Sequence, residues 1–102
     1  MLAITRYRVP SAETDLFVRT ARGVLQAIEG SPGHLSGRLA RAVDDPELWA
    51  MVTDWEGAGF YRRALGDYEV RLALIPLSRL AIDEAGAYEI VEPATPEERL
   101  AE

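Results

Sequence analysis

The sequence has 102 residues and contains no cysteine, no lysine, no asparagine and only one histidine. The absence of cysteine excludes disulfide bonds and thiolate metal sites. A single histidine cannot supply the set of nitrogen ligands that a zinc site needs. We therefore expect a protein without a metal centre.

Long apolar runs and blocks of positive charge are also missing. No stretch approaches the roughly 18 apolar residues of a membrane span, and the first ten residues, MLAITRYRVP, lack the apolar centre of a signal peptide. The net charge is −6, and all eleven basic residues are arginine. An acidic chain of this kind is a poor match for a phosphate backbone. These features predict a cytoplasmic protein with neither nucleic acid nor membrane as a partner.

The residues that are present have the composition of a folded domain, with 48% hydrophobic and 27% charged residues. Apolar alternation and helical spacing divide the chain into seven elements. Strands are predicted at 2–9, 34–43, 48–55 and 87–92, and helices from the N-cap Ser11 to Gly30, at 58–66, and from 69 to the residue before Pro76.

Counted with its last two helical segments as one, the chain has the order β-α-β-β-α-β, which predicts an α+β ferredoxin-like fold with an antiparallel sheet and helices on one face. Residues 1–92 are expected to form one domain. The remaining residues, 93–102, read PATPEERLAE and are expected to form a polar C-terminal tail.

The strand predicted at 48–55 is apolar on both faces. One face carries Trp49, Met51 and Trp55, and the other carries Leu48 and Val52. Helices from the same chain cover only one face of such a sheet, so the second apolar face needs another cover. A second copy of the chain, packed sheet against sheet, is the simplest cover, and we expect a homodimer.

Four stretches, PGHLSGRLAR, DDPELWAMVTDW, FYRRAL and AYEIVE, resemble the antibiotic biosynthesis monooxygenase (ABM) family. The resemblance extends over about residues 1 to 92. Its most recognisable part is Trp55 at the end of a strand, followed six residues later by Tyr61. Members of this family are small ferredoxin-like proteins that form dimeric α/β barrels, so the resemblance implies this architecture.

The best-understood branch of the family oxidises aromatic anthrones to quinones with molecular oxygen and no cofactor. The resemblance therefore implies a cofactor-independent monooxygenase whose substrates are O₂ and a small aromatic, phenolic or quinol-like molecule. Met51 stands where that branch has an asparagine, and Arg41 stands where it has a histidine. The implied catalytic residues are Trp55, Tyr61 and Arg71, and the implied substrate-pocket residues are Trp49, Met51 and Arg41.

Two other branches of the family carry out different reactions. One degrades haem and needs an asparagine and a histidine ligand. This chain has no asparagine, and its one histidine, His34, begins a predicted strand. The sequence therefore argues against haem degradation. The other branch oxidises quinols, and the sequence leaves that activity open.

Taken by themselves, the same residues also fit structural roles. Trp49 and Trp55 fit a core beneath the helices, Arg71 fits a surface ion pair, and Arg41 fits a pair with the aspartates at 44–45. The alternative function is a non-catalytic dimeric protein, either small-ligand-binding or structural, on the same scaffold.

Overall fold

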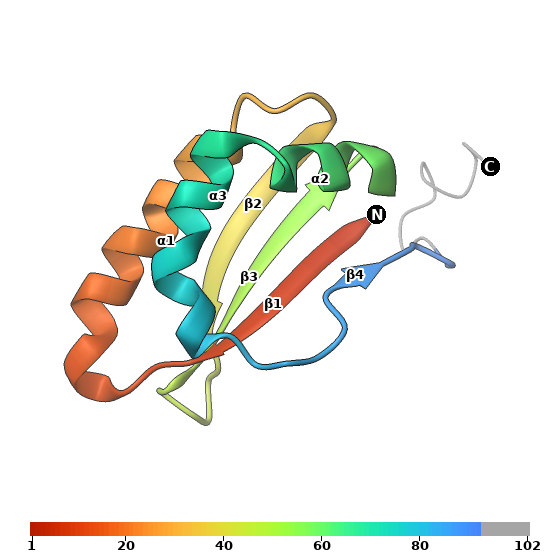
Figure 1. Ribbon diagram of the computed structural model, residues 1–102. Helices are drawn as coiled ribbons and strands as arrows, with labels where there is room; N and C mark the ends of the chain where they lie inside the picture. The colour runs from red at the N-terminus through yellow and green to blue at the C-terminus, as the bar shows by residue number, and fades with distance from the viewer. Residues whose placement is uncertain (93–102) are drawn as a thin grey trace.

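A computed structural model describes residues 1–92, and the predicted tail at 93–102 lies outside the described residues (Figure 1). The elements are β1 (Leu2–Arg8), the 3-10 turn η1 (Ser11–Glu13), α1 (Thr14–Ile28), β2 (His34–Arg41), β3 (Leu48–Trp55), α2 (Ala58–Leu65), α3 (Tyr68–Leu74), the 3-10 helix η2 (Ile75–Leu80) and β4 (Ala87–Tyr88). None of the helices in this part of the chain combines the length and the apolar character that a bilayer crossing requires.

The four strands form one antiparallel sheet in the order β2-β3-β1-β4. This topology, with its helices between the strands, confirms the predicted α+β ferredoxin-like fold. Three strands are shorter than predicted: β1 ends at Arg8, β2 ends at Arg41, and β4 contains only Ala87 and Tyr88, which pair with Ala3 and Leu2. Since β1 begins at Leu2, the chain beyond Tyr88 has no further β1 residue to pair with.

The helix α1 is amphipathic, and its apolar side faces the sheet. Its buried residues, Phe17, Ala21, Val24 and Ile28, recur every three or four positions. The predicted N-cap, Ser11, does not cap this helix. Its backbone N–H and its hydroxyl both donate to the Glu47 carboxylate, at 3.1 and 3.2 Å, and α1 begins three residues later.

All the helices pack on one face of the sheet. Along β3 the residues Trp49, Met51, Thr53 and Trp55 are buried, whereas the residues between them are partly exposed. Phe17 of α1 packs against Trp49, and Val70 of α3 belongs to the same core cluster as Trp55. In Figure 1 α1 and α3 run side by side along this covered face.

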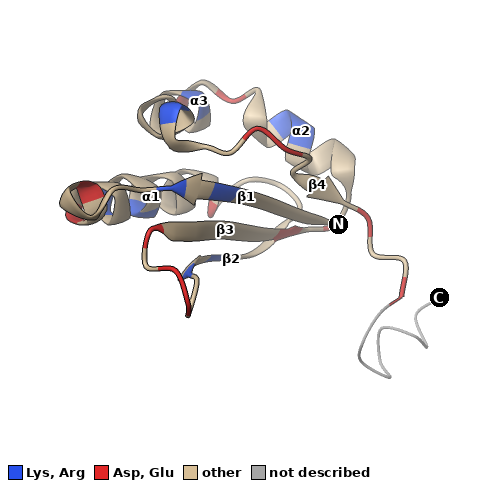
Figure 2. Ribbon diagram, turned by 90° about the horizontal axis from the view of Figure 1, so that it is seen from below, with Lys and Arg blue, Asp and Glu red and all other residues tan. Residues whose placement is uncertain are grey.

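The opposite face of the sheet has no cover from the described residues. Its centre is apolar, with Ile4 on β1 and Val52 on β3 in register with each other. At one end Arg6 pairs with Glu84 at 2.6 Å, and Arg8 pairs with Asp45 at 2.7 Å. Figure 2 shows these basic positions on β1 and the acidic residues in the neighbouring turns. We call this surface the open sheet face; its apolar members are Leu2, Ile4, Leu48, Ala50 and Val52.

Candidate active site

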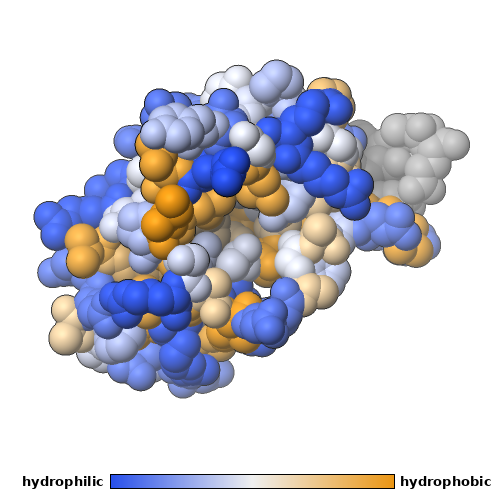
Figure 3. Space-filling model, in the orientation of Figure 1, coloured by the Kyte–Doolittle hydropathy of each residue, from blue (hydrophilic) through white to orange (hydrophobic). Residues whose placement is uncertain are grey.

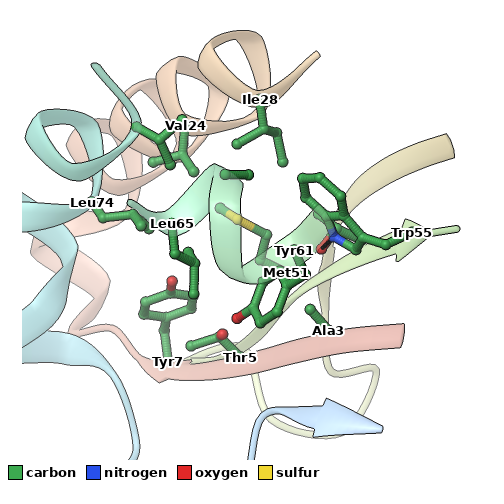
Figure 4. Close-up of a pocket in the computed structure, with 13 residues that line it drawn as sticks. Ala3, Thr5, Tyr7, Val24, Ile28, Met51, Trp55, Tyr61, Leu65 and Leu74 are labelled. Carbon is green, nitrogen blue, oxygen red and sulfur yellow. Dashed lines mark hydrogen bonds between the residues drawn. The ribbon is translucent and has the colours of Figure 1, made fainter. Parts of the chain in front are cut away.

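A cavity of about 40 Å³ lies between the covered face of the sheet and the helices α1, α2 and α3 (Figure 4). A cavity that takes up benzene has roughly 150 Å³, so an aromatic ring enters only when side chains at the rim move. Leu65 of α2 is 36% exposed and lies at this rim. Figure 3 shows the hollowed, partly apolar surface in this region. The lining residues are Ala3, Thr5, Tyr7, Val24, Ile28, Met51, Thr53, Trp55, Tyr61, Ala64, Leu65, Val70 and Leu74.

Trp55 forms one wall of the cavity and is 2% exposed. Its indole N–H donates to the hydroxyl of Thr53, with an Nε1–Oγ1 distance of 2.8 Å. The ring lies between His34 and Tyr61, at centroid distances of 5.1 and 5.7 Å. The orientation of the indole is therefore fixed from three sides, and Trp55 offers a ligand its ring and not its N–H.

Tyr61 enters the cavity from the helix side. It lies on α2 with Ala64 and Leu65, which follow at helical spacing and also line the cavity. Burial raises the pKa of the Tyr61 hydroxyl above its ordinary value. The hydroxyl is therefore protonated at neutral pH and is available as a hydrogen-bond donor.

Met51 also lines the cavity, from the centre of β3. It is 6% exposed and stands opposite Thr5 in the β1–β3 register. A thioether is only a weak acceptor and donates no hydrogen bond. This position therefore supplies polarisable apolar surface where an asparagine would supply an amide.

Two cavity residues on β1, Thr5 and Tyr7, were not predicted from the sequence. Tyr7 is 3% exposed, and burial, followed by the influence of Tyr61, raises its pKa to about 12. The alternation of β1 carries the missed signal, because Ala3, Thr5 and Tyr7 share one face. The register that puts this face beside Met51 was not available from the sequence.

Arg71, the third implied catalytic residue, does not line the cavity. It is exposed on α3, because Val70 and Leu74 occupy the inward positions of that helix. No ion pair of Arg71 with another residue in the 1–92 range is observed. The structure therefore separates Arg71 from Trp55 and Tyr61.

Trp49 and Arg41 lie together, but away from the cavity. Trp49 is buried against Phe17, with a centroid distance of 5.4 Å. The Arg41 guanidinium lies over the Trp49 ring, 5.0 Å from its centroid. The expected pair between Arg41 and the aspartates of the neighbouring turn is not formed: Asp45 pairs with Arg8, and the Arg41 guanidinium lies on the Trp49 ring instead.

The lining defines what the cavity can do chemically. None of its thirteen residues is an aspartate, glutamate, histidine, lysine or arginine. Its polar groups are the hydroxyls of Thr5, Tyr7, Thr53 and Tyr61. Within residues 1–92, no group of three or more acidic or histidine side chains is placed to hold a metal ion. The cavity therefore suits an uncharged, largely apolar molecule with a hydrogen-bonding oxygen.

Comparison with protein families defines the class to which this fold and cavity belong. The family model described as antibiotic biosynthesis monooxygenase matches residues 1–65, which is more than half of the chain. The chain belongs to this family. The matched part runs from β1 to the end of α2 and so includes Trp55 and Tyr61, whereas Arg71 lies beyond it.

Solved structures with the same fold include SnoaB, a cofactor-independent oxygenase from Streptomyces nogalater. SnoaB shares 19% identity and a TM-score of 0.80, with 91% of this chain and 94% of that chain covered. A provisionally named antibiotic biosynthesis monooxygenase from Nitrosomonas europaea shares 15% identity and has a TM-score of 0.73, with 89% of this chain and 98% of that chain covered. A protein from Methanosarcina mazei Go1 shares 13% identity and has a TM-score of 0.73, with 81% of this chain and 82% of that chain covered. At these identities the likeness establishes the fold. No curated protein matches the chain.

Proposed function

We propose that the protein is a cofactor-independent monooxygenase that oxidises a small aromatic, phenolic or quinol-like substrate in the cavity beside Trp55 and Tyr61. The observation that carries this proposal is an apolar cavity with a fixed indole wall and an inward-pointing tyrosine hydroxyl. Membership of the antibiotic biosynthesis monooxygenase family supports it. The description of SnoaB as a cofactor-independent oxygenase supports it as well.

The proposed reaction needs only the substrate, molecular oxygen and a dry, oriented site. In an anthrone-like substrate, the ring CH₂ group beside the phenolic rings loses a proton, and the resulting carbanion passes its electrons to O₂. One oxygen atom becomes the new carbonyl and the other leaves as water, so that R₂CH₂ and O₂ give R₂C=O and H₂O. The protonated Tyr61 hydroxyl donates to the substrate oxygen where negative charge develops. Because the lining contains no carboxylate or imidazole, the proton passes to water at the mouth.

We further propose that the working form is a homodimer built through the open sheet face. Ile4 and Val52 place an apolar centre on this face, and no described residue of the same chain covers it. Burying apolar surface is worth roughly 25 cal/mol per Å² before the costs of association. A second copy supplies a matching sheet by twofold symmetry.

One observation favours a second function, that of a non-catalytic small-ligand-binding protein. The cavity is small, at about 40 Å³, and its lining offers donors and acceptors but no acid–base group. Such a site binds a molecule without helping to move its protons. The two functions share the same cavity and differ in whether oxygen is consumed.

Oxygen uptake tests the proposal directly. The protein is mixed with a panel of hydroxyanthrones and quinols in an oxygen electrode, and products are analysed by mass spectrometry after a reaction under ¹⁸O₂. Incorporation of one ¹⁸O atom into an organic product supports monooxygenation. Quenching of tryptophan fluorescence by a panel member without oxygen uptake supports the binding function instead. Loss of uptake in Tyr61→Phe, with Arg71→Ala unaffected, assigns the reaction to this cavity.

A further inference from the structure

We propose that Tyr7 is a second hydrogen-bond donor in the cavity, and that it and Tyr61 together hold one oxygen atom of an uncharged aromatic ligand. This inference rests on the proposed function of the cavity and specifies its substrate class. It adds to the site a residue of β1, on the opposite side of the cavity from α2.

The two hydroxyls reach the same space from different layers of the fold. Tyr7 rises from the sheet and Tyr61 descends from α2, and Figure 4 shows both hydroxyls pointing into the cavity. Thr5, Tyr7 and Tyr61 all line the cavity, and the pKa of Tyr7, which burial and then Tyr61 raise, is lowered by a side-chain hydrogen bond with Thr5. A ligand oxygen between the two tyrosine hydroxyls accepts two hydrogen bonds.

Tyr7 is held rigidly in this orientation. Its backbone pairs with that of Trp49 in the β1–β3 register, and its ring packs on Phe17 at a centroid distance of 5.3 Å. Tyr61 is anchored by its contact with the Trp55 ring. A donor pair that is already oriented loses little conformational entropy when it binds, so a correctly placed oxygen is favoured over a misplaced one.

The two ends of the cavity differ in polarity. The hydroxyls of Tyr7, Tyr61 and Thr5 gather at the β1 end (Figure 4). At the other end, the N–H of Trp55 is already donated to Thr53, so only its ring faces a ligand. An aromatic ligand is therefore oriented with its oxygen toward β1 and its ring toward Trp55.

The lining also selects against charge. Both tyrosines are protonated at neutral pH, and burial raises their pKa values further, that of Tyr7 to about 12. They donate to an oxygen but provide no positive charge, and the cavity contains no arginine, lysine or histidine. A carboxylate inside it would be a buried anion without a counter-ion, which is strongly unfavourable. The expected ligand class is a neutral phenol, quinol or aromatic ketone.

Three probes of similar size test this inference without any turnover: phenol, toluene and benzoate. Each is titrated into the protein, and binding is followed by tryptophan fluorescence and by NMR shifts of the probe. The wild type is expected to bind phenol several-fold more tightly than toluene, and benzoate least. Tyr7→Phe and Tyr61→Phe are each expected to weaken phenol binding by about five-fold, the effect of one hydrogen bond of ordinary strength, and to leave toluene unchanged.

Tyr88→Phe is the matched control, since Tyr88 is exposed on β4 and lies outside the cavity. The inference is overturned if Tyr7→Phe weakens phenol and toluene equally, or if benzoate binds as tightly as phenol. Circular dichroism and the unfolding midpoint check that each variant is folded. If Tyr7→Phe does not fold, the phenol affinity of Tyr61→Phe and the benzoate titration of the wild type test the inference in its place. Oxygen uptake that is unchanged in Tyr7→Phe removes this inference and leaves the proposed function standing. Selective phenol binding without any oxygen uptake supports this inference and contradicts the proposed monooxygenase function.

Discussion

Trp55 and Thr53, two residues apart on the same buried face of β3, are joined by a hydrogen bond from the indole Nε1 to the hydroxyl Oγ1 at 2.8 Å. Side chains at i and i+2 of a strand share a face, so the hydroxyl lies within reach of the indole. The bond satisfies a donor that burial would otherwise leave without a partner. It also leaves Trp55 with only its ring to offer a ligand, so hydrogen bonds to a ligand fall to the tyrosines.

Removing the acceptor is therefore expected to destabilise the fold. Thr53→Val keeps the shape and leaves Nε1 buried without a partner, which costs about 1 to 3 kcal/mol of unfolding free energy. In a Trp55→Phe background the same change is expected to cost much less, because the donor is gone. Urea unfolding of the two single variants and the double variant measures the coupling. Equal costs in both backgrounds would show that the hydrogen bond contributes nothing.

Tyr7 is expected to make stability depend on pH at the alkaline end. Its pKa is raised from 10.0 to about 12 in the folded protein, so the folded state favours the protonated form. That stabilisation is complete below about pH 10 and is lost as the pH rises through about 12. The two-unit difference corresponds to about 2 to 3 kcal/mol. Urea unfolding from pH 8 to 11.5 is expected to show a steeper decline in the wild type than in Tyr7→Phe, and parallel declines would contradict the assignment.

Arg71→Ala is expected to leave the chemistry unchanged. The side chain is exposed on the outer side of α3, and neighbouring Val70 fills the inward position. Oxygen uptake and the affinity for phenol are therefore expected to match the wild type within error. Tyr61→Phe, measured in parallel, is expected to reduce both. A several-fold loss in Arg71→Ala alone would bring this arginine back into the mechanism.

Much of the architecture could be predicted because the local signals agree with the tertiary packing. The residues of 48–55 predicted the strand, although both of its faces are apolar, and Pro76 marked the end of α3. Ser11 was misassigned, because its backbone N–H and hydroxyl bond Glu47, which is 36 positions away in the sequence. The length of β4 depends on where β1 begins, and no property of 87–92 itself reveals that.

The site was only partly predictable for a similar reason. The family resemblance pointed to Trp55, Tyr61 and Met51, and the structure brings these three side chains together at the cavity. The orientation of α3 about its own axis decides which residue faces inward, and there Val70 takes that position and Arg71 does not. The contribution of Tyr7 depends on the register between β1 and β3, which only the fold supplies.

Two glycine substitutions are expected to act in opposite directions. Gly33 precedes β2 with φ at 79°, and a Cβ placed there would come within 2.3 Å of the Phe60 side chain. Gly33→Ala is expected to destabilise by about 1 to 2 kcal/mol from the backbone alone, with a further cost from the clash. Gly23 lies within α1 and has open space around its Cβ position.

Gly23→Ala is therefore expected to stabilise the protein by about 0.5 to 1 kcal/mol, because alanine loses less backbone entropy in a helix. Thermal and urea unfolding of both variants provide the comparison. If Gly33→Ala left the unfolding free energy unchanged, the turn before β2 would relax at no cost. The placement of His34 against Trp55 would then not depend on the conformation of Gly33.

The open sheet face provides the last prediction, which concerns the proposed homodimer. Val52 lies at its centre, opposite Ile4 and remote from the helices. If two copies meet there, Val52→Lys buries two ammonium groups in an apolar interface, a change that costs several kcal/mol per ion. Sedimentation velocity is expected to show a dimer for the wild type and a monomer for Val52→Lys at the same concentration.

Leu72→Lys is the matched control, since Leu72 is 45% exposed on α3, on the other side of the molecule. A wild-type monomer, or dissociation caused equally by both variants, would contradict the proposed interface. The cavity lies on the helix-covered side, so the phenol affinity of a monomeric Val52→Lys protein is expected to equal that of the wild type.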